Sequence, residues 1–64
     1  MAAEFYRVLF FDKKENKTTN HFVFTRDINQ ACKEIMQETP YVNVISWKQV
    51  DEDDLPDLVV VIQK

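Results

Sequence analysis

The chain has 64 residues with a formal net charge of −3, and 45% of its residues are hydrophobic and 12% aromatic. This composition is too apolar for a disordered chain, and a domain of this size buries only about 60% of its unfolded surface, so association with a partner would stabilise it. No apolar run approaches the ~20 residues of a membrane span, and the first residues, MAAEFYR, lack the features of a signal peptide, so we expect one cytoplasmic domain over residues 1–64.

Glycine and cysteine usage limits the chemistry. The sequence contains no glycine, so it cannot hold a P-loop, a dinucleotide-binding fingerprint or a nucleophile elbow, and we expect no cofactor. Its one cysteine, Cys32, excludes an intramolecular disulfide and a zinc site built from several cysteines. Any turn that needs a positive φ must use Asn or Asp, which tolerate that conformation best after glycine.

The N-terminal part of the chain has the pattern of a β-hairpin. Residues 5–11 and 18–25 are rich in aromatic and β-branched side chains, which favour strands. The polar residues 12–17 (DKKENK) predict the connection between them, with Asn16 in the left-handed conformation.

Residues 27–39 predict the helix around which the fold is organised. Asp27 suits the N-cap, because its carboxylate can accept a bond from a free N–H of the first turn, and Gln30 stands where a capping-box partner belongs. Pro40 ends the helix, since it disfavours helical geometry at the preceding residue. The apolar stripe expected to face the core, with Cys32 as an inert member, consists of Ile28, Ala31, Cys32, Ile35 and Met36.

The C-terminal part of the chain predicts two more strands. Residues 41–50 form the third strand, in which Ile45 and Trp47 share a face in the absence of a bulge. Residues 51–57 (DEDDLPD) form an acidic loop, and residues 58–62 form a continuous apolar strand of the kind that is buried on both faces.

The predicted fold class is α+β. We expect a small ββαββ two-layer sandwich, with one antiparallel four-stranded sheet and a single helix on one face. The apolar residues expected beneath the helix are Tyr6, Val8, Phe10, Phe22, Phe24, Val42, Val44, Leu58, Val60 and Ile62.

The opposite face of the predicted sheet is the predicted partner-binding surface. Its residues are Phe5, Leu9, Phe11, Ile45, Trp47, Val59 and Val61, with Val23 among them. Monomers rarely expose an apolar patch of this size unless it binds something, and the simplest partner is a second copy related by a two-fold axis. Trp47 is the expected anchor. The alternatives are a strongly twisted sheet whose loops fold over this face, or a different strand register.

The distribution of charge supports a second hypothesis. Residues 1–33 carry six Lys or Arg against four Asp or Glu, whereas residues 34–64 carry two against seven. Cations beside exposed aromatic side chains can bind nucleic acid, although a pI near 4.9 is unlike that of a nucleic-acid-binding domain. The residues of this nucleic-acid-binding alternative are Arg7, Lys13, Lys14, Lys17 and Arg26.

The acidic loop supports a third hypothesis. Its carboxylates belong to Asp51, Glu52, Asp53, Asp54 and Asp57. They lack the central glycine and closing Glu of a calcium loop, so we expect no metal site. They could keep the neighbouring apolar strand soluble, or they could present a basic partner with an acidic surface that mimics nucleic acid.

No group of residues predicts catalysis. His21 is the one histidine, and spacing places no Ser, Cys or carboxylate beside it. We therefore expect a non-enzymatic protein-interaction module, a homodimer formed through the sheet face away from the helix, with no membrane contact and no small-molecule substrate. An acidic chain of this length is also typical of the accessory or inhibitory proteins that mobile elements encode.

Overall fold

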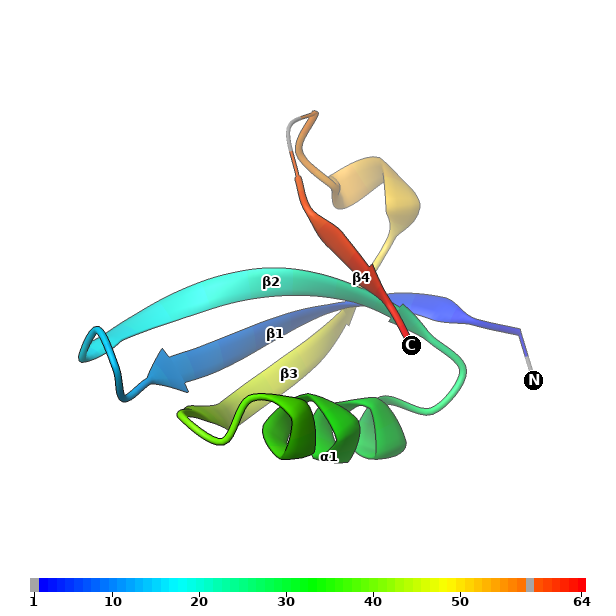
Figure 1. Cartoon of the computed structure of the whole chain (residues 1–64). Helices are drawn as coiled ribbons and strands as arrows, with labels where there is room; N and C mark the ends of the chain where they lie inside the picture. Colours follow the sequence, from blue (N-terminus) through cyan, green and yellow to red (C-terminus); the bar gives the residue numbers. More distant parts are fainter. Residues whose placement is uncertain (1, 58) are drawn as a thin grey trace.

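The computed structural model describes residues 2–57 and 59–64. Within them the elements are β1 (Glu4–Asp12), β2 (Lys17–Thr25), α1 (Ile28–Glu38), β3 (Val42–Val50), a 3₁₀ helix η1 (Glu52–Asp54) and β4 (Val61–Gln63). The strands form one four-stranded sheet in the order β3-β1-β2-β4, and α1 lies against one face of it (Figure 1). The α+β class, with one α-helix and four strands, is confirmed.

The sheet is mixed, so the prediction of a purely antiparallel sheet is wrong. β1 pairs antiparallel with β2 and with β3, whereas β4 pairs parallel with β2. The chain does not turn back beside β3 after that strand ends. It passes through η1 and crosses to the far edge of the sheet, so the simple ββαββ order is not observed either. A parallel pairing requires a crossover of this kind.

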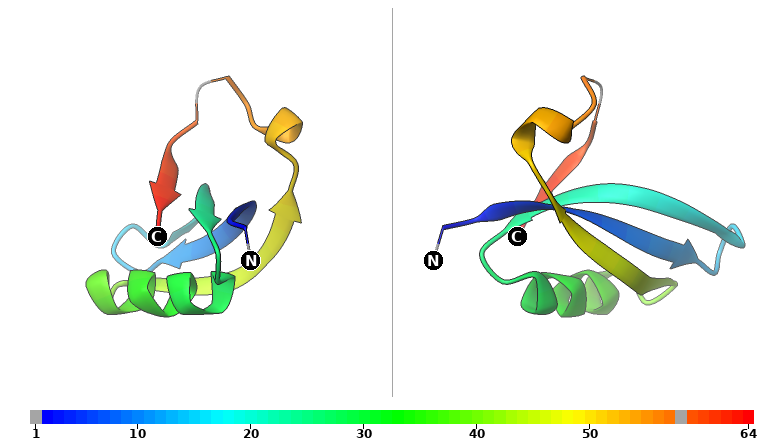
Figure 2. Two further views of the ribbon diagram at one scale, coloured as in Figure 1. Left: turned by 90° about the vertical axis from the view of Figure 1, so that its right-hand side faces the viewer. Right: turned by 180° about the vertical axis from the view of Figure 1, so that it is seen from behind.

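The two crossovers place the helix and the last connection on opposite faces. β2, β3 and β4 run in the same direction, and α1 carries the chain across the sheet from β2 to β3, whereas residues 51–60 carry it back from β3 to β4. Such connections are almost always right-handed, so two that travel in opposite directions must use opposite faces. Figures 1 and 2 show this arrangement, with α1 on one side and the connection rising on the other. We call residues 51–57 and 59–60 the arch.

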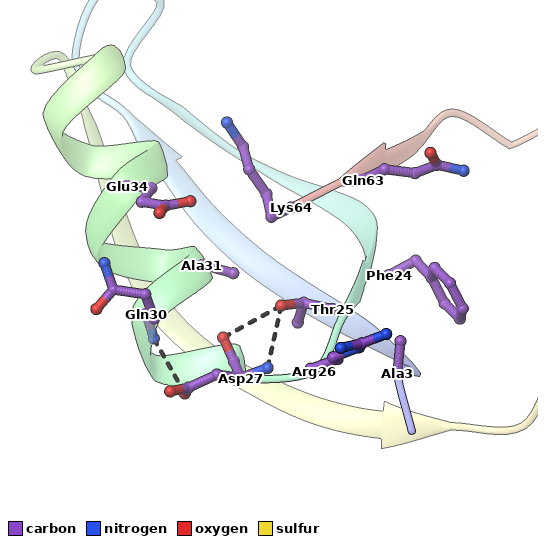
Figure 3. A pocket seen from close by; sticks show the side chains of 10 residues that line it. All are labelled: Ala3, Phe24, Thr25, Arg26, Asp27, Gln30, Ala31, Glu34, Gln63 and Lys64. Carbon is purple, nitrogen blue, oxygen red and sulfur yellow. Dashed lines mark hydrogen bonds between the residues drawn. The ribbon is translucent and has the colours of Figure 1, made fainter. Parts of the chain in front are cut away.

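The start of α1 agrees with the sequence prediction. The Asp27 carboxylate accepts a hydrogen bond of 3.2 Å from the Gln30 N–H (Figure 3). The Asp27 N–H donates to the Thr25 hydroxyl, and that hydroxyl donates to the Asp27 carbonyl, both at 3.2 Å. The Gln30 side chain therefore does not take the predicted capping-box role. The helix ends at Glu38 before Pro40, as predicted.

The β1–β2 turn sets which side chains meet the helix. Asn16 has a φ of 56°, as predicted, and the Asp12 carboxylate accepts hydrogen bonds from the N–H groups of Lys14 and Glu15. This turn pairs Asp12 with Lys17, and the register continues to a pair between Tyr6 and Val23. Side chains that are directly opposite each other share a face. Val23 therefore lies on the helix side.

The core occupies one layer between the sheet and α1. Its buried apolar residues are Val8, Phe10, Val23, Ile28, Ala31, Cys32 and Ile35, with Tyr6, Val42, Val44 and Ile62 packed around them. The apolar stripe of α1 is thus confirmed for Ile28, Ala31, Cys32 and Ile35, whereas Met36 is half-buried and lies outside the core. The placement of Phe22 and Phe24 beneath the helix is wrong, because the turn register directs both to the other face.

The last strand is shorter than predicted. β4 is limited to Val61–Gln63, and its Ile62 packs against the core. Val60 belongs to the arch and is 74% exposed, so the prediction that it lies beneath the helix is wrong. Leu58, the first residue of the predicted strand, lies outside the described residues.

Candidate functional site

The sheet face away from α1 carries a row of apolar side chains from every strand. We call this surface the open face, and its apolar residues are Phe5, Leu9, Phe11, Phe22, Phe24, Val50 and Val61. Each of them is half-buried, which contrasts with the fully buried side chains beneath the helix. Within residues 2–57 and 59–64, the open face therefore differs from the core in having no helix or strand packed flat upon it.

The arch approaches one end of the open face only. At that end the rings of Phe5 and Phe24 pack with their centroids 4.6 Å apart, and a shallow pocket separates them from Val50 and from Asp51 and Glu52 of the arch. Figure 1 shows the arch standing away from the sheet, while the β1–β2 hairpin extends beyond it. The alternative in which the loops of a twisted sheet fold over this face is thus partly correct. The arch covers one end of the open face, and the end formed by the β1–β2 hairpin stays uncovered.

Two cations interrupt the apolar surface of the open face. Arg7 of β1 lies directly opposite Lys48 of β3, and both side chains are exposed. Arg7 also pairs with Phe22 across the β1–β2 ladder. Like charges at directly opposed positions destabilise a sheet. The side chains that the structure describes form ion pairs between Lys17 and Glu15 and between Lys64 and Glu38, and Arg7 and Lys48 take part in neither.

A bulge in β3 moves two of the predicted partner-binding residues to the helix side. The β1–β3 register shifts between Leu9 and Phe10, which pair with Ser46 and Val44, so that Ile45 is the extra residue. Trp47 then pairs with buried Val8, and its ring packs edge-on against Tyr6 with centroids 5.5 Å apart. The placement of Trp47 and Ile45 on the face away from the helix is therefore wrong.

Ile45 and Trp47 nonetheless remain accessible. They are 53% and 44% exposed and line a shallow groove between β3 and α1, with Met36 and Lys33 on its helical side. β3 is an edge strand, so its outer backbone groups are unpaired within the sheet. This groove is a second accessible apolar surface, separated from the open face by the thickness of the sheet.

The predicted partner-binding residues thus divide among three places. Phe5, Leu9, Phe11 and Val61 lie on the open face, Ile45 and Trp47 lie in the β3 groove, and Val59 is a half-buried residue of the arch. Sequence reasoning missed Phe22, Phe24, Val50 and Lys48 as members of the open face. For Phe22 and Phe24 the available signal was the four residues between Asp12 and Lys17, because the length of a hairpin loop fixes its register, whereas the places of Val50 and Lys48 depend on the bulge in β3.

The cations of the nucleic-acid alternative do not form one stripe. Lys13, Lys14 and Lys17 cluster at the β1–β2 turn, where Lys17 pairs with Glu15 at 2.8 Å and Lys14 lies 5.6 Å from the Tyr41 ring centroid. Arg26 lies at the opposite end of β2, beside the start of α1 (Figure 3). Arg7 is the one member of this set on the open face.

The acidic residues, by contrast, gather in one projecting segment. Asp51, Glu52, Asp53, Asp54 and Asp57 all lie in the arch, and all are exposed. Within residues 2–57 and 59–64, no three His, Cys, Asp or Glu side chains are grouped so that they could hold a metal ion. The arch is therefore a dispersed row of negative charge on the same side of the sheet as the open face.

The remaining reactive side chains are in the core layer. Burial raises the pKa of the Cys32 thiol, which keeps it protonated at neutral pH and makes it a poor nucleophile. His21 is half-buried on the helix side, with its ring 5.1 Å from that of Phe10.

No helix in the described part of the chain is long and apolar enough to cross a membrane.

No family model matches the chain, and neither the curated proteins nor the solved structures contain a significant match to it. Its function is therefore inferred from its own residues.

Proposed function

We propose that this protein is a small non-enzymatic interaction module that forms a homodimer through the open face. The observation that carries the proposal is the asymmetry of the two sheet faces. One face is filled by α1, whereas the other presents Phe5, Leu9, Phe11, Phe22 and Val61 with no element packed flat upon them. A sheet is stable in water when its apolar face is covered, and a second sheet can provide that cover.

The accessible area of the chain supports the same proposal. A monomer of this mass is expected to expose about 4,300 Å². The chain exposes 4794 Å². The excess is roughly 500 Å², which is more than half of the ~800 Å² that each partner buries in a standard interface. This excess belongs to the whole chain, and the projecting arch contributes to it together with the open face.

A two-fold axis gives the simplest dimer of this kind. The same patch serves both subunits in such an interface, so no second complementary surface is needed. Two open faces in contact would form a second core, flanked by the two helical layers. The arch stands at one end of each face, so the contact would centre on the middle of the face, around Arg7, Leu9 and Phe22.

A pair of matched double variants tests the proposal. Leu9→Ser with Phe22→Ser removes two large side chains from the open face, whereas Ile45→Ser with Tyr41→Ser removes two that are accessible elsewhere. Sedimentation velocity should show a dimer for the wild type and the control, and a monomer for the open-face variant. Circular dichroism checks that each variant is folded. A dimer that persists in the folded open-face variant would refute the proposal.

The cellular setting is part of the proposal. The one cysteine is a buried free thiol, which suits a reducing compartment such as the cytoplasm. An acidic surface suits an accessory or inhibitory factor. The acidic-mimic hypothesis has one specific observation in its favour, since the five carboxylates project together on the arch. Retention of a basic protein by the wild type, lost on Asp53→Lys with Asp54→Lys, would support it.

Nucleic-acid binding is the weaker alternative. The cations expected to serve it lie at opposite ends of β2, and the acidic arch stands over the same face as the aromatic side chains. Titration with labelled single-stranded and duplex oligonucleotides at two salt concentrations tests it directly. Binding through phosphates must weaken steeply as salt increases.

A further inference from the structure

Arg7 and Lys48 lie directly opposite each other within the open face, and neither takes part in the ion pairs that the described residues form. Directly opposed side chains lie about 5 Å apart at Cβ, so the two positive charges repel each other in the isolated chain. Apolar side chains surround them, with Phe5 and Leu9 two residues away on β1 and Phe22 across the ladder. An anionic group placed between the two cations would relieve this repulsion, and burial of the site would strengthen the attraction.

The same side of the sheet carries the strongest negative charge of the chain. The arch holds five exposed carboxylates, and the described ion pairs do not connect any of them to Arg7 or Lys48. Figures 1 and 2 show why, because the arch rises away from the sheet toward the space that a partner on the open face would occupy. On this side of the sheet the chain thus presents two exposed cations, Arg7 and Lys48, and the carboxylates of the arch, and the described ion pairs do not join the two groups.

We propose that Arg7 and Lys48 of each copy bind the acidic arch of the other copy across the open-face dimer, an inference that rests on the proposed self-association. A two-fold axis converts the unmatched charges into two equivalent contacts, each between one cationic pair and one arch. The occupant of the site is therefore a peptide segment with several carboxylates, supplied by a second copy of this chain.

The charges of the chain favour this occupant over a nucleic acid. Two copies carry a net charge of −3 each, so they repel at long range unless opposite charges meet at the interface. A polyanion that approached Arg7 and Lys48 would meet the same repulsion from the arch without any gain from it. When the partner is a second copy, the arch of one copy binds the cations of the other, so the negative charge of the arch attracts the partner instead of repelling it. The contact also fixes the orientation of the two sheets.

Charge reversal with a complementary mixture tests the proposal. Arg7→Glu with Lys48→Glu reverses the cationic pair, and Asp53→Lys with Asp54→Lys reverses part of the arch. Each change alone weakens or reverses the attraction at both contacts, so we expect the dimer dissociation constant to rise on the order of tenfold or more. In an equimolar mixture of the two variants, the wild-type cations of one chain meet the wild-type arch of the other, so the mixture should dimerise more tightly than either variant alone. Sedimentation equilibrium gives the constants.

A matched control separates local pairing from net charge. Arg26→Glu with Lys33→Glu changes the net charge by the same four units but on the helix side of the sheet, and it should leave the wild-type constant within about threefold because exposed charges far from the contact are screened by salt. Dimers that tolerate both reversed variants, or a mixture that stays monomeric, would overturn the arch contact and leave the open-face dimer intact. Monomeric wild type at every concentration would overturn both proposals.

Discussion

The position of Val23 provides the sharpest test of the fold. Val23 is 0% exposed, pairs with Tyr6 on one side and Ile62 on the other, and lies beneath α1. Val23→Ala removes two buried methyl groups, each worth about 0.8 kcal/mol of transfer free energy, and leaves a cavity, so the expected loss is about 2–3 kcal/mol. A domain of this size has roughly 3–5 kcal/mol of stability in total, so the loss is a large share of it.

Urea unfolding followed by circular dichroism measures this loss. We expect the transition midpoint to fall with an unchanged slope, and the melting temperature to fall by roughly 10–20 °C. Thr18→Ala is the control, because Thr18 is exposed on the same strand and its substitution should change stability by less than about 0.5 kcal/mol. A Val23→Ala variant as stable as this control would refute the register, since Val23 would then face solvent.

Three further predictions follow from single contacts. Asp27→Ala removes the N-cap acceptor for the Gln30 N–H and should lower the free energy of unfolding by about 1 kcal/mol in a thermal melt, whereas Asp27→Asn should lower it less. Equal losses for the two variants would show that the Asp27 side chain does not cap the helix. Burial raises the pKa of Cys32 above the ordinary thiol value of 9.0, so the folded state holds its proton more firmly than the unfolded state and stability should fall as pH rises above about 9. Cys32→Ala should remove that part of the pH dependence, and a thiol reagent at pH 8 should label the native protein far more slowly than the urea-unfolded protein. Glu38→Gln removes the negative charge that contacts the Lys64 ammonium group at 2.6 Å. Because the Glu38 side chain is exposed, the loss of stability in urea unfolding should stay below about 1 kcal/mol. A larger loss would show that this contact holds the C-terminus in place.

The helix and its ends follow from local sequence. The 3.6-residue spacing of Ile28, Ala31, Cys32 and Ile35 is found only on one side, so the buried stripe is unambiguous. Asp27 and Pro40 act on neighbouring backbone groups, and Asn16 is the residue in its turn that best tolerates a positive φ. Such features depend on a few adjacent residues, which is why sequence alone predicts them.

The strand faces could not be predicted in the same way. β1 is apolar on both sides, so alternation does not say which side meets the helix. The face of β2 depends on the length of the turn, and a shift of one residue exchanges Val23 with Phe22. The bulge at Ile45 then reverses the expectation for Trp47, because an extra residue changes which side the following residues face.

The parallel pairing of β4 depends on long-range geometry. A hairpin with β3 and a crossover to β2 are both compatible with the acidic residues 51–57, and the short Val61–Gln63 strand carries too few side chains to favour one. The candidate surface was predicted in outline, since an apolar second face was expected. Its members Phe22, Phe24 and Lys48 depend on registers that only the fold defines.

Sedimentation equilibrium of the wild-type chain over a wide range of concentrations tests the central claim most directly. Coverage of Phe5, Leu9, Phe11 and Phe22 by a second copy predicts a mass that rises from 7.6 kDa toward twice that value as concentration increases. A mass that stays at 7.6 kDa up to millimolar concentration would contradict it.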